Sequence, residues 1–138
     1  MPVTVDLLRL VPLFNGMTDR SFEALAALAS EADYAAADDL VRQGEPGEAF
    51  IIIVRGRARV ARDGRTLREL GPGDFLGEIS LVDGSPRTAT VSALDPIHAL
   101  VIGRLGFLDL IERLPVFRLE ILNALTERIR ATATEPLG

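Results

Sequence analysis

The sequence contains no cysteine, a single histidine and no lysine among its 138 residues. Without cysteine the chain can form neither a disulfide nor a thiolate metal site, and nothing in it requires an oxidising compartment. One histidine, His98, is too few for a zinc or iron site built from several imidazoles. All 15 basic residues are scattered arginines, and the formal net charge is −5. We therefore do not expect the chain to bind nucleic acid by electrostatic attraction alone.

Long hydrophobic runs are also missing. No wholly apolar run is longer than Ala49 to Val54, which is far shorter than the ~20 residues that a membrane-spanning helix needs. The first residues lack the basic stretch and apolar core of a secretory signal. We therefore expect a cytoplasmic protein without a membrane span. Because 48% of the residues are hydrophobic, the chain can form a real core, and its length fits a single domain over residues 1–138.

Residues 1–33 have the pattern of a helical segment. Thr18 can cap a helix that carries Asp19 in its first turn. The apolar residues that then fall on one face are Phe22, Leu25, Ala26, Leu28 and Ala29. A shorter helix, Val5 to Leu10, is expected to stop before Pro12. The apolar segment 11–14 around this proline is expected to pack into the core.

Residues 34–103 have the sequence pattern of an antiparallel β-sandwich, because short segments rich in Val, Ile, Leu and Thr are separated by glycines. Phe50 to Val54 is apolar on both faces, as in a strand between two layers. Arg57 to Arg62 and Thr88 to Ala93 alternate, and Asp63-Gly64 is a hairpin signal. The expected fold is mainly β: an antiparallel jelly-roll (double-stranded β-helix) with N-terminal helices and two C-terminal helices.

Residues 104–131 return to a helical pattern. A short helix is expected to end near Leu114, and Pro115 suits the first turn of the next one. Along that last helix Arg118, Leu122, Leu125 and Ile129 recur at helical spacing. The tail after Arg130 is expected to fray.

The segment most informative about function is 75–91, FLGEISLVDGSPRTATV. It places Gly77-Glu78 before an apolar stretch, a glycine and Pro86-Arg87-Thr88. A guanidinium matches two phosphate oxygens, and N–H groups at the start of a helical turn attract anions. A carboxylate can accept a hydrogen bond from a sugar hydroxyl. The order therefore suits a phosphate and a ribose, although Glu78 and Arg87 could also pair with each other or lie in solvent.

Three stretches resemble the cyclic nucleotide-binding domain family. They are VPLFNGMTDRSFEALA, LVRQGEPGEAFIIIVRGRARV and GDFLGEISLVDGSPRTATVSA, and the last looks like the phosphate-binding cassette of that family. With the closing helices, the resemblance extends from about residue 7 to residue 130.

The resemblance implies a nucleotide-binding role for Gly77, Glu78, Ile79, Ser80, Arg87, Thr88 and Ala89. Glu78, with Gly77, would bind the ribose 2′-hydroxyl, and Arg87 would hold the cyclic phosphate. Ser80 and Thr88 would donate backbone N–H groups to that phosphate. The last helix would close over the base as a lid, and either Arg128 or Arg130 could reach the base.

The function implied is a sensor or regulatory domain and not an enzyme. Its ligand would be cAMP rather than cGMP, with no prosthetic group and no metal. Binding would move the C-terminal helices and signal to an unknown effector protein, or to a second copy through the last helix. No helix-turn-helix follows, so we expect no direct binding to nucleic acid. Two alternatives stay open: a domain of the same fold that has lost its ligand, and a metal-dependent jelly-roll enzyme, which the single histidine disfavours.

Overall fold

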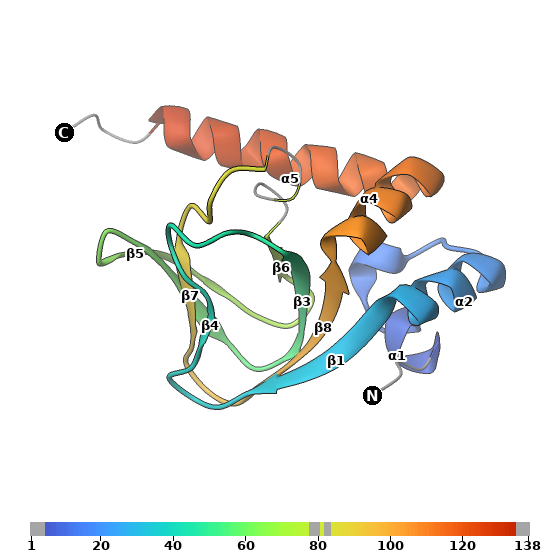
Figure 1. Cartoon of the computed structure of the whole chain (residues 1–138), viewed down its shortest axis with the longest axis horizontal. Helices are drawn as coiled ribbons and strands as arrows, with labels where there is room; N and C mark the ends of the chain where they lie inside the picture. The colour runs from blue at the N-terminus through green and yellow to red at the C-terminus, as the bar shows by residue number, and fades with distance from the viewer. Residues whose placement is uncertain (1–4, 78–80, 82–83, 135–138) are drawn as a thin grey trace.

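The computed structural model of the chain describes residues 5–77, 81 and 84–134, with side chains as far as residue 127 (Figure 1). In chain order the elements are α1 (Val5–Arg9), the 3-10 helix η1 (Pro12–Phe14), α2 (Asp19–Leu28), β1 (Ala29–Tyr34), β2 (Asp39–Val41), β3 (Ala49–Arg55), β4 (Ala58–Arg62), β5 (Arg65–Leu70), β6 (Phe75–Leu76), β7 (Thr90–Ala93), β8 (Ile97–Gly103), α4 (Arg104–Arg113) and α5 (Pro115–Thr134).

The strands form two antiparallel sheets of four strands each. Their orders are β1-β8-β3-β6 and β2-β7-β4-β5, so strands distant in sequence become neighbours. The sheets face each other in Figure 1, with the N-terminal helices beside the first sheet and α5 across one end of the sandwich. This arrangement confirms the predicted antiparallel β jelly-roll with flanking helices.

Two local predictions about strands are confirmed. Residues 50–53 of β3 are all buried, because one face of this strand lies between the sheets and the other lies under the helices. The β4–β5 hairpin turns at Asp63 and Gly64, whose φ angles of 53° and 76° are those of a tight two-residue turn. Arg62 pairs with Arg65 across this turn.

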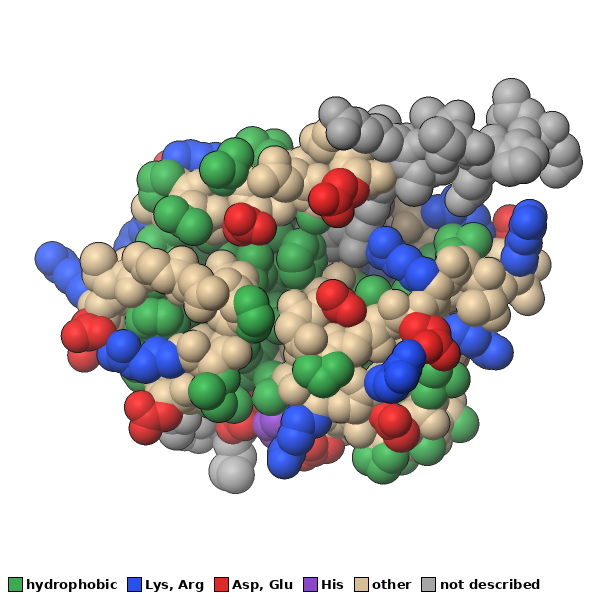
Figure 2. All heavy atoms as spheres, turned by 180° about the vertical axis from the view of Figure 1, so that it is seen from behind, with side chains coloured by type: hydrophobic (Ala, Val, Ile, Leu, Met, Phe, Trp, Pro, Cys, Tyr) green, Lys and Arg blue, Asp and Glu red, His purple; other side chains and the backbone are tan. Residues whose placement is uncertain are grey.

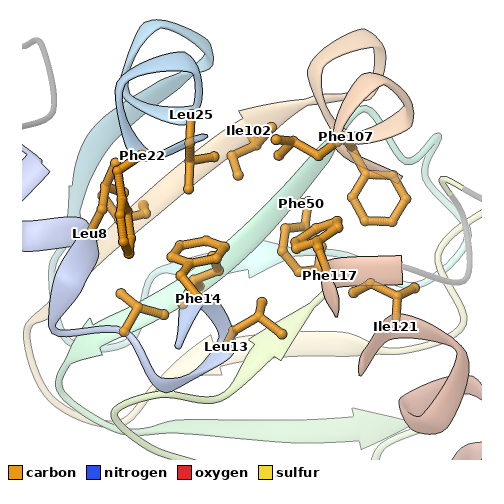
Figure 3. Close-up of a cluster of buried hydrophobic side chains, with 14 of the residues drawn as sticks. Leu8, Leu13, Phe14, Phe22, Leu25, Phe50, Ile102, Phe107, Phe117 and Ile121 are labelled. Atoms are coloured by element: carbon orange, nitrogen blue, oxygen red, sulfur yellow. The ribbon is translucent and has the colours of Figure 1, made fainter. Parts of the chain in front are cut away.

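The core has two clusters, one on each face of the β1-β8-β3-β6 sheet. The cluster between the sheets contains Ile51, Ile53, Val60 and Val91. The cluster on the outer face joins that sheet to the helices, and Figure 3 shows side chains of both terminal helical regions meeting there. Its ring contacts link Phe75 to Phe50, Phe50 to both Phe107 and Phe117, and Phe117 to Phe14.

The N-terminal prediction is correct for the helix start and wrong for its end. Thr18 caps α2 by accepting a hydrogen bond from the Ser21 N–H at 3.1 Å. The helix stops at Leu28, and Ala29 begins β1. The first strand therefore starts earlier than residue 34, where the sequence indicated that the β region would begin. The sequence of β1 is ASEADY, which lacks apolar alternation, but the strand pairs with β8 along its whole length.

Three C-terminal details also differ from expectation. Helix α5 continues to Thr134 instead of fraying after Arg130. Its buried positions are Phe117 and Ile121, whereas Leu122 in the expected apolar stripe is 53% exposed. Strand β7 begins at Thr90 rather than at Thr88, because residues 87–89 belong to the loop that carries the site.

Candidate functional site

Arg87 is the central side chain of the predicted cassette. Only 7% of it is exposed, and it is the only charged side chain that is buried among the described residues. Its Nη2 donates to the carbonyl oxygen of Ala49 at 2.7 Å, and its Nη1 donates to the carbonyl oxygen of Gly77 at 3.2 Å. Two fixed carbonyls from different parts of the chain therefore orient the guanidinium.

Gly77 is required by this arrangement. Its φ of +100° lies in the region that side chains other than glycine rarely adopt. A Cβ at this position would lie 2.6 Å from both the Ala49 carbonyl oxygen and Arg87 Nη1. The space that a side chain on Gly77 would fill is used by the arginine and by the Ala49 carbonyl.

The backbone of the cassette is held by the loop between β2 and β3. The Arg87 N–H donates to the Glu45 carbonyl at 2.8 Å, and the Gly44 N–H donates to the Arg87 carbonyl at 2.9 Å. These two bonds fix the direction in which the Arg87 side chain leaves the chain.

The β4–β5 hairpin supports the residues that follow. Arg62 Nε donates to the Thr88 carbonyl at 3.0 Å. Gln43 joins the hairpin tip to the cassette, because its N–H donates to Thr90 Oγ1 at 3.0 Å and its side chain exchanges two hydrogen bonds with Asp63. The loop therefore has side-chain support from the β4–β5 hairpin and from Gln43.

The structure brings together four of the residues predicted for the site: Gly77, Arg87, Thr88 and Ala89. Glu78, Ile79 and Ser80 lie outside the described residues. Leu81, just beyond them, is fully buried in the helix-side cluster, and its N–H donates to the Gly77 carbonyl at 3.3 Å.

Several supporting residues were missed from the sequence. Ala49 and Glu45 act through backbone carbonyls, which leave no signature in residue type. Arg62 and Gln43 are polar residues beside turns, and only the pairing of β4 and of β2 with β7 shows that they reach the cassette.

Arg68 lies on the inner side of the β4–β5 hairpin. It pairs with Val60, which is 6% exposed and packs between the sheets, and directly opposite residues of antiparallel strands project to the same side. Val60 in turn pairs with Val91 of β7, two residues after Ala89. The Arg68 side chain is exposed and forms no hydrogen bond or ion pair with the described part of the chain.

His98 lies in β8 and has two specific partners. Its Nδ1 is 2.7 Å from Asp33 Oδ1 and its Nε2 is 2.8 Å from Glu31 Oε1. These bonds, that to Asp33 first, raise the pKa of the imidazole above its ordinary value. Because the ring separates the two carboxylates, the three groups do not converge on a common point. No group of three or more metal-ligating side chains occurs in the described ranges.

Figure 2 shows acidic, basic and apolar side chains interspersed over the rear face. None of the helices in the described residues is long and apolar enough to span a membrane.

The fold is thus a β-sandwich with closing helices, and its cassette holds a buried arginine that depends on a glycine. The family model named Cyclic nucleotide-binding domain matches residues 31–114, which is more than half of the chain. The chain belongs to this family, as its sequence indicated.

Individual relatives agree with this assignment. The chain is 36% identical over 103 residues to a cAMP-dependent protein kinase regulatory subunit of Debaryomyces hansenii, covering 74% of this chain and 23% of that protein. It is 34% identical over 117 residues to a cGMP-dependent protein kinase of Drosophila melanogaster, covering 79% and 12%. The crystal structure of Thermus thermophilus Catabolite Activator Protein superposes with a TM-score of 0.78 at 31% identity, covering 88% and 60%. The chain thus spans 60% or less of each of these proteins.

Proposed function

We propose that this chain is a sensor that binds a cyclic nucleotide at the cassette and transmits the binding event through its C-terminal helices. The observation that carries the proposal is the buried guanidinium of Arg87, held by the carbonyls of Ala49 and Gly77. A guanidinium fixed in this way is already oriented, and its fork matches two phosphate oxygens. Glu78 would accept a hydrogen bond from the ribose 2′-hydroxyl, and Ser80 and Thr88 would donate N–H groups to the phosphate.

Two observations bear on the base of the ligand, and they favour different nucleotides. The resemblance favours cAMP. Arg68, on the inner side of the hairpin, favours cGMP, because a guanidinium only donates hydrogen bonds. Guanine presents two acceptors, N7 and O6, on the edge where adenine presents one acceptor and one donor.

We propose that the signal passes through the phenylalanine contacts. Phe75 of β6 lies two residues before Gly77, and its ring centroid is 5.3 Å from that of Phe50. Phe50 contacts Phe117 of α5 at 5.9 Å and Phe107 of α4 at 5.0 Å. A shift at the cassette would therefore be felt at both C-terminal helices, provided that the ligand binds two arrangements with different affinity.

The outer side of these helices offers a surface for the recipient of the signal. Leu105, Val116, Leu119 and Leu122 are 84%, 50%, 57% and 53% exposed. We propose that an effector protein or a second copy of the chain covers them. Light scattering with and without nucleotide distinguishes a homodimer from a monomer that awaits another partner.

The test of the proposal is calorimetric titration with cAMP, cGMP and the non-cyclic control 5′-AMP, after mass spectrometry has shown whether a nucleotide co-purifies. Saturable one-site binding of a cyclic nucleotide and much weaker binding of 5′-AMP are expected. Absence of binding in nucleotide-free protein would instead favour a ligand-free interaction domain of the same fold. A bound ligand should also raise the melting temperature by mass action.

A further inference from the structure

The tip of the β4–β5 hairpin extends beyond the sheet that carries it. The pairing of β4 with β7 ends at Ala61 and Thr90, so residues 62–65 pair only with each other among the described strands. Strand β5 is the last strand of its sheet, and residues 65–69 are exposed (Figure 1). Because a two-stranded ribbon is only marginally stable by itself, the position of the tip depends on side-chain contacts with the rest of the domain.

Gln43, in the loop after β2, makes two of these contacts. Its Nε2 donates to Asp63 Oδ1 at 2.9 Å, and its Oε1 accepts the Asp63 N–H at 2.9 Å. A carboxamide suits this pair of bonds because it offers a donor and an acceptor at the end of one side chain. The Gln43 N–H also donates to Oγ1 of Thr90, the first residue of β7, at 3.0 Å. Gln43 therefore joins the hairpin tip to the strand that follows the cassette.

Arg62, just before the hairpin turn, connects the tip to the cassette itself. Its Nε donates to the Thr88 carbonyl at 3.0 Å. The same peptide carries the N–H of Ala89, and in a trans peptide the carbonyl and the N–H point in opposite directions. The bond from Arg62 therefore fixes the direction of the Ala89 N–H, which points away from the hairpin.

The Ala89 N–H is a donor that the protein itself does not use. Ala89 is 9% exposed, and its N–H forms no hydrogen bond with the described part of the chain. Most N–H groups of buried residues are paired, because an unpaired one costs free energy. The N–H is therefore available to an acceptor on a ligand, and its direction depends on Arg62.

We propose that Gln43 is a positioning residue for the cyclic nucleotide. It holds the hairpin tip so that Arg62 stays on the Thr88 carbonyl, and the Ala89 N–H is thereby kept in the direction from which the cyclic phosphate accepts it. Gln43 acts through these residues and not by touching the ligand. This role rests on the function proposed above, and it extends the binding site to the hairpin tip.

Gln43→Met tests this role, because methionine keeps the length of the side chain and removes both of its hydrogen bonds without changing the charge. The Kd for cAMP or cGMP, measured by calorimetry, should rise by about threefold to tenfold. Thr66→Met is the matched control. Thr66 is an exposed, neutral residue of the same hairpin, and its side chain forms no hydrogen bond with the described residues, so the Kd should stay at the wild-type value.

A double variant, Gln43→Glu with Asp63→Asn, exchanges the two side-chain types and keeps the net charge. The carboxylate at position 43 can accept from both the N–H and the side-chain amide at position 63, and asparagine tolerates the φ of 53° there. The Kd should therefore return close to the wild-type value.

The NMR signal of the Ala89 amide follows the same route in the absence of nucleotide. It should shift in Gln43→Met, return toward its wild-type position in the double variant and stay in place in Thr66→Met. An unchanged Kd in Gln43→Met, a double variant that fails to restore it, or an unmoved Ala89 signal would overturn the role of Gln43 and leave the nucleotide function intact. A wild-type protein that binds no cyclic nucleotide would overturn the proposed function and this role with it.

Discussion

The guanidinium of Arg87 lies where any residue other than glycine at position 77 would place its Cβ. The guanidinium donates to the Gly77 carbonyl, and a Cβ on Gly77 would lie 2.6 Å from Arg87 Nη1. The glycine and the arginine of the motif, ten positions apart in the sequence, are therefore one structural unit.

Gly77→Ala should disrupt this unit. The positive φ alone costs roughly 1–3 kcal/mol for a side chain other than glycine, and the clash with a backbone carbonyl adds to that cost. We expect a lower melting temperature together with weaker nucleotide binding. Gly16→Ala is the matched control, because Gly16 has φ +85° but a Cβ there would meet nothing within 4 Å. The control should lose only the roughly 1–3 kcal/mol that the positive φ costs; equal losses in the two variants would contradict the steric argument.

Arg87→Ala should remove most of the affinity for the cyclic phosphate. The loss expected for a buried anion without its charge-assisted partner is at least ~2 kcal/mol, about thirtyfold in Kd. Calorimetry measures it, with Arg59→Ala as control, since Arg59 is an exposed arginine paired across the hairpin with Glu69. An Arg87→Ala protein that folds and binds with unchanged affinity would refute the phosphate assignment.

Glu78→Gln tests the ribose contact. The variant should bind cAMP or cGMP more weakly by about 1 kcal/mol, because a neutral amide oxygen replaces the charged acceptor of the hydrogen bond. Its melting temperature without nucleotide should be preserved. Binding of a 2′-deoxy cyclic nucleotide should hardly change, and an equal loss with the deoxy ligand would show that Glu78 acts elsewhere.

Arg68→Ala tests the base preference. If the guanidinium reads guanine, the variant loses about 1–3 kcal/mol of cGMP affinity and little cAMP affinity. Arg59→Ala serves again as control, because Arg59 is on the same hairpin but on the face opposite to Val60. Equal changes for the two nucleotides would leave cAMP as the better prediction.

His98 should make stability depend on pH in one direction. Its bonds to Asp33 and Glu31 raise the pKa of the folded imidazole, so their stabilisation is complete at pH values below the unfolded pKa. It is lost as the pH rises through the raised, folded pKa. Melting temperatures of the wild type and of His98→Gln, compared from about pH 5 to about pH 9, should therefore converge at the alkaline end. Parallel curves would show that the two bonds contribute nothing.

The parts of the structure that the sequence predicted are the turns and helix ends, whose conformation depends on a few neighbouring residues. Asp63-Gly64 formed the expected hairpin, Thr18 capped its helix, and Pro115 began the last one. Strand β1 was missed because Glu31 and Asp33 look like helix or loop residues, and only their pairing with β8 makes them a strand.

The residues of the site also fall into those that the sequence predicted and those that it did not. The residue types of the cassette predicted Gly77 and Arg87 together. The carbonyl of Ala49 and the support from Arg62 could not be predicted, because they depend on the register of strands far apart in sequence. The apolar face of α5 was assigned to Leu122 because its spacing fits a stripe, yet the helix is rotated so that Phe117 and Ile121 meet the phenylalanine cluster.

The carbonyl of Ala49 also limits how portable the cassette is. Residues 75–91 form one continuous segment, but their arginine is held by the start of β3 and their backbone by Glu45 and Gly44. Grafting the segment into an unrelated scaffold would transfer its sequence without its geometry. A designer who wished to move this recognition element would have to move the β2–β3 loop with it.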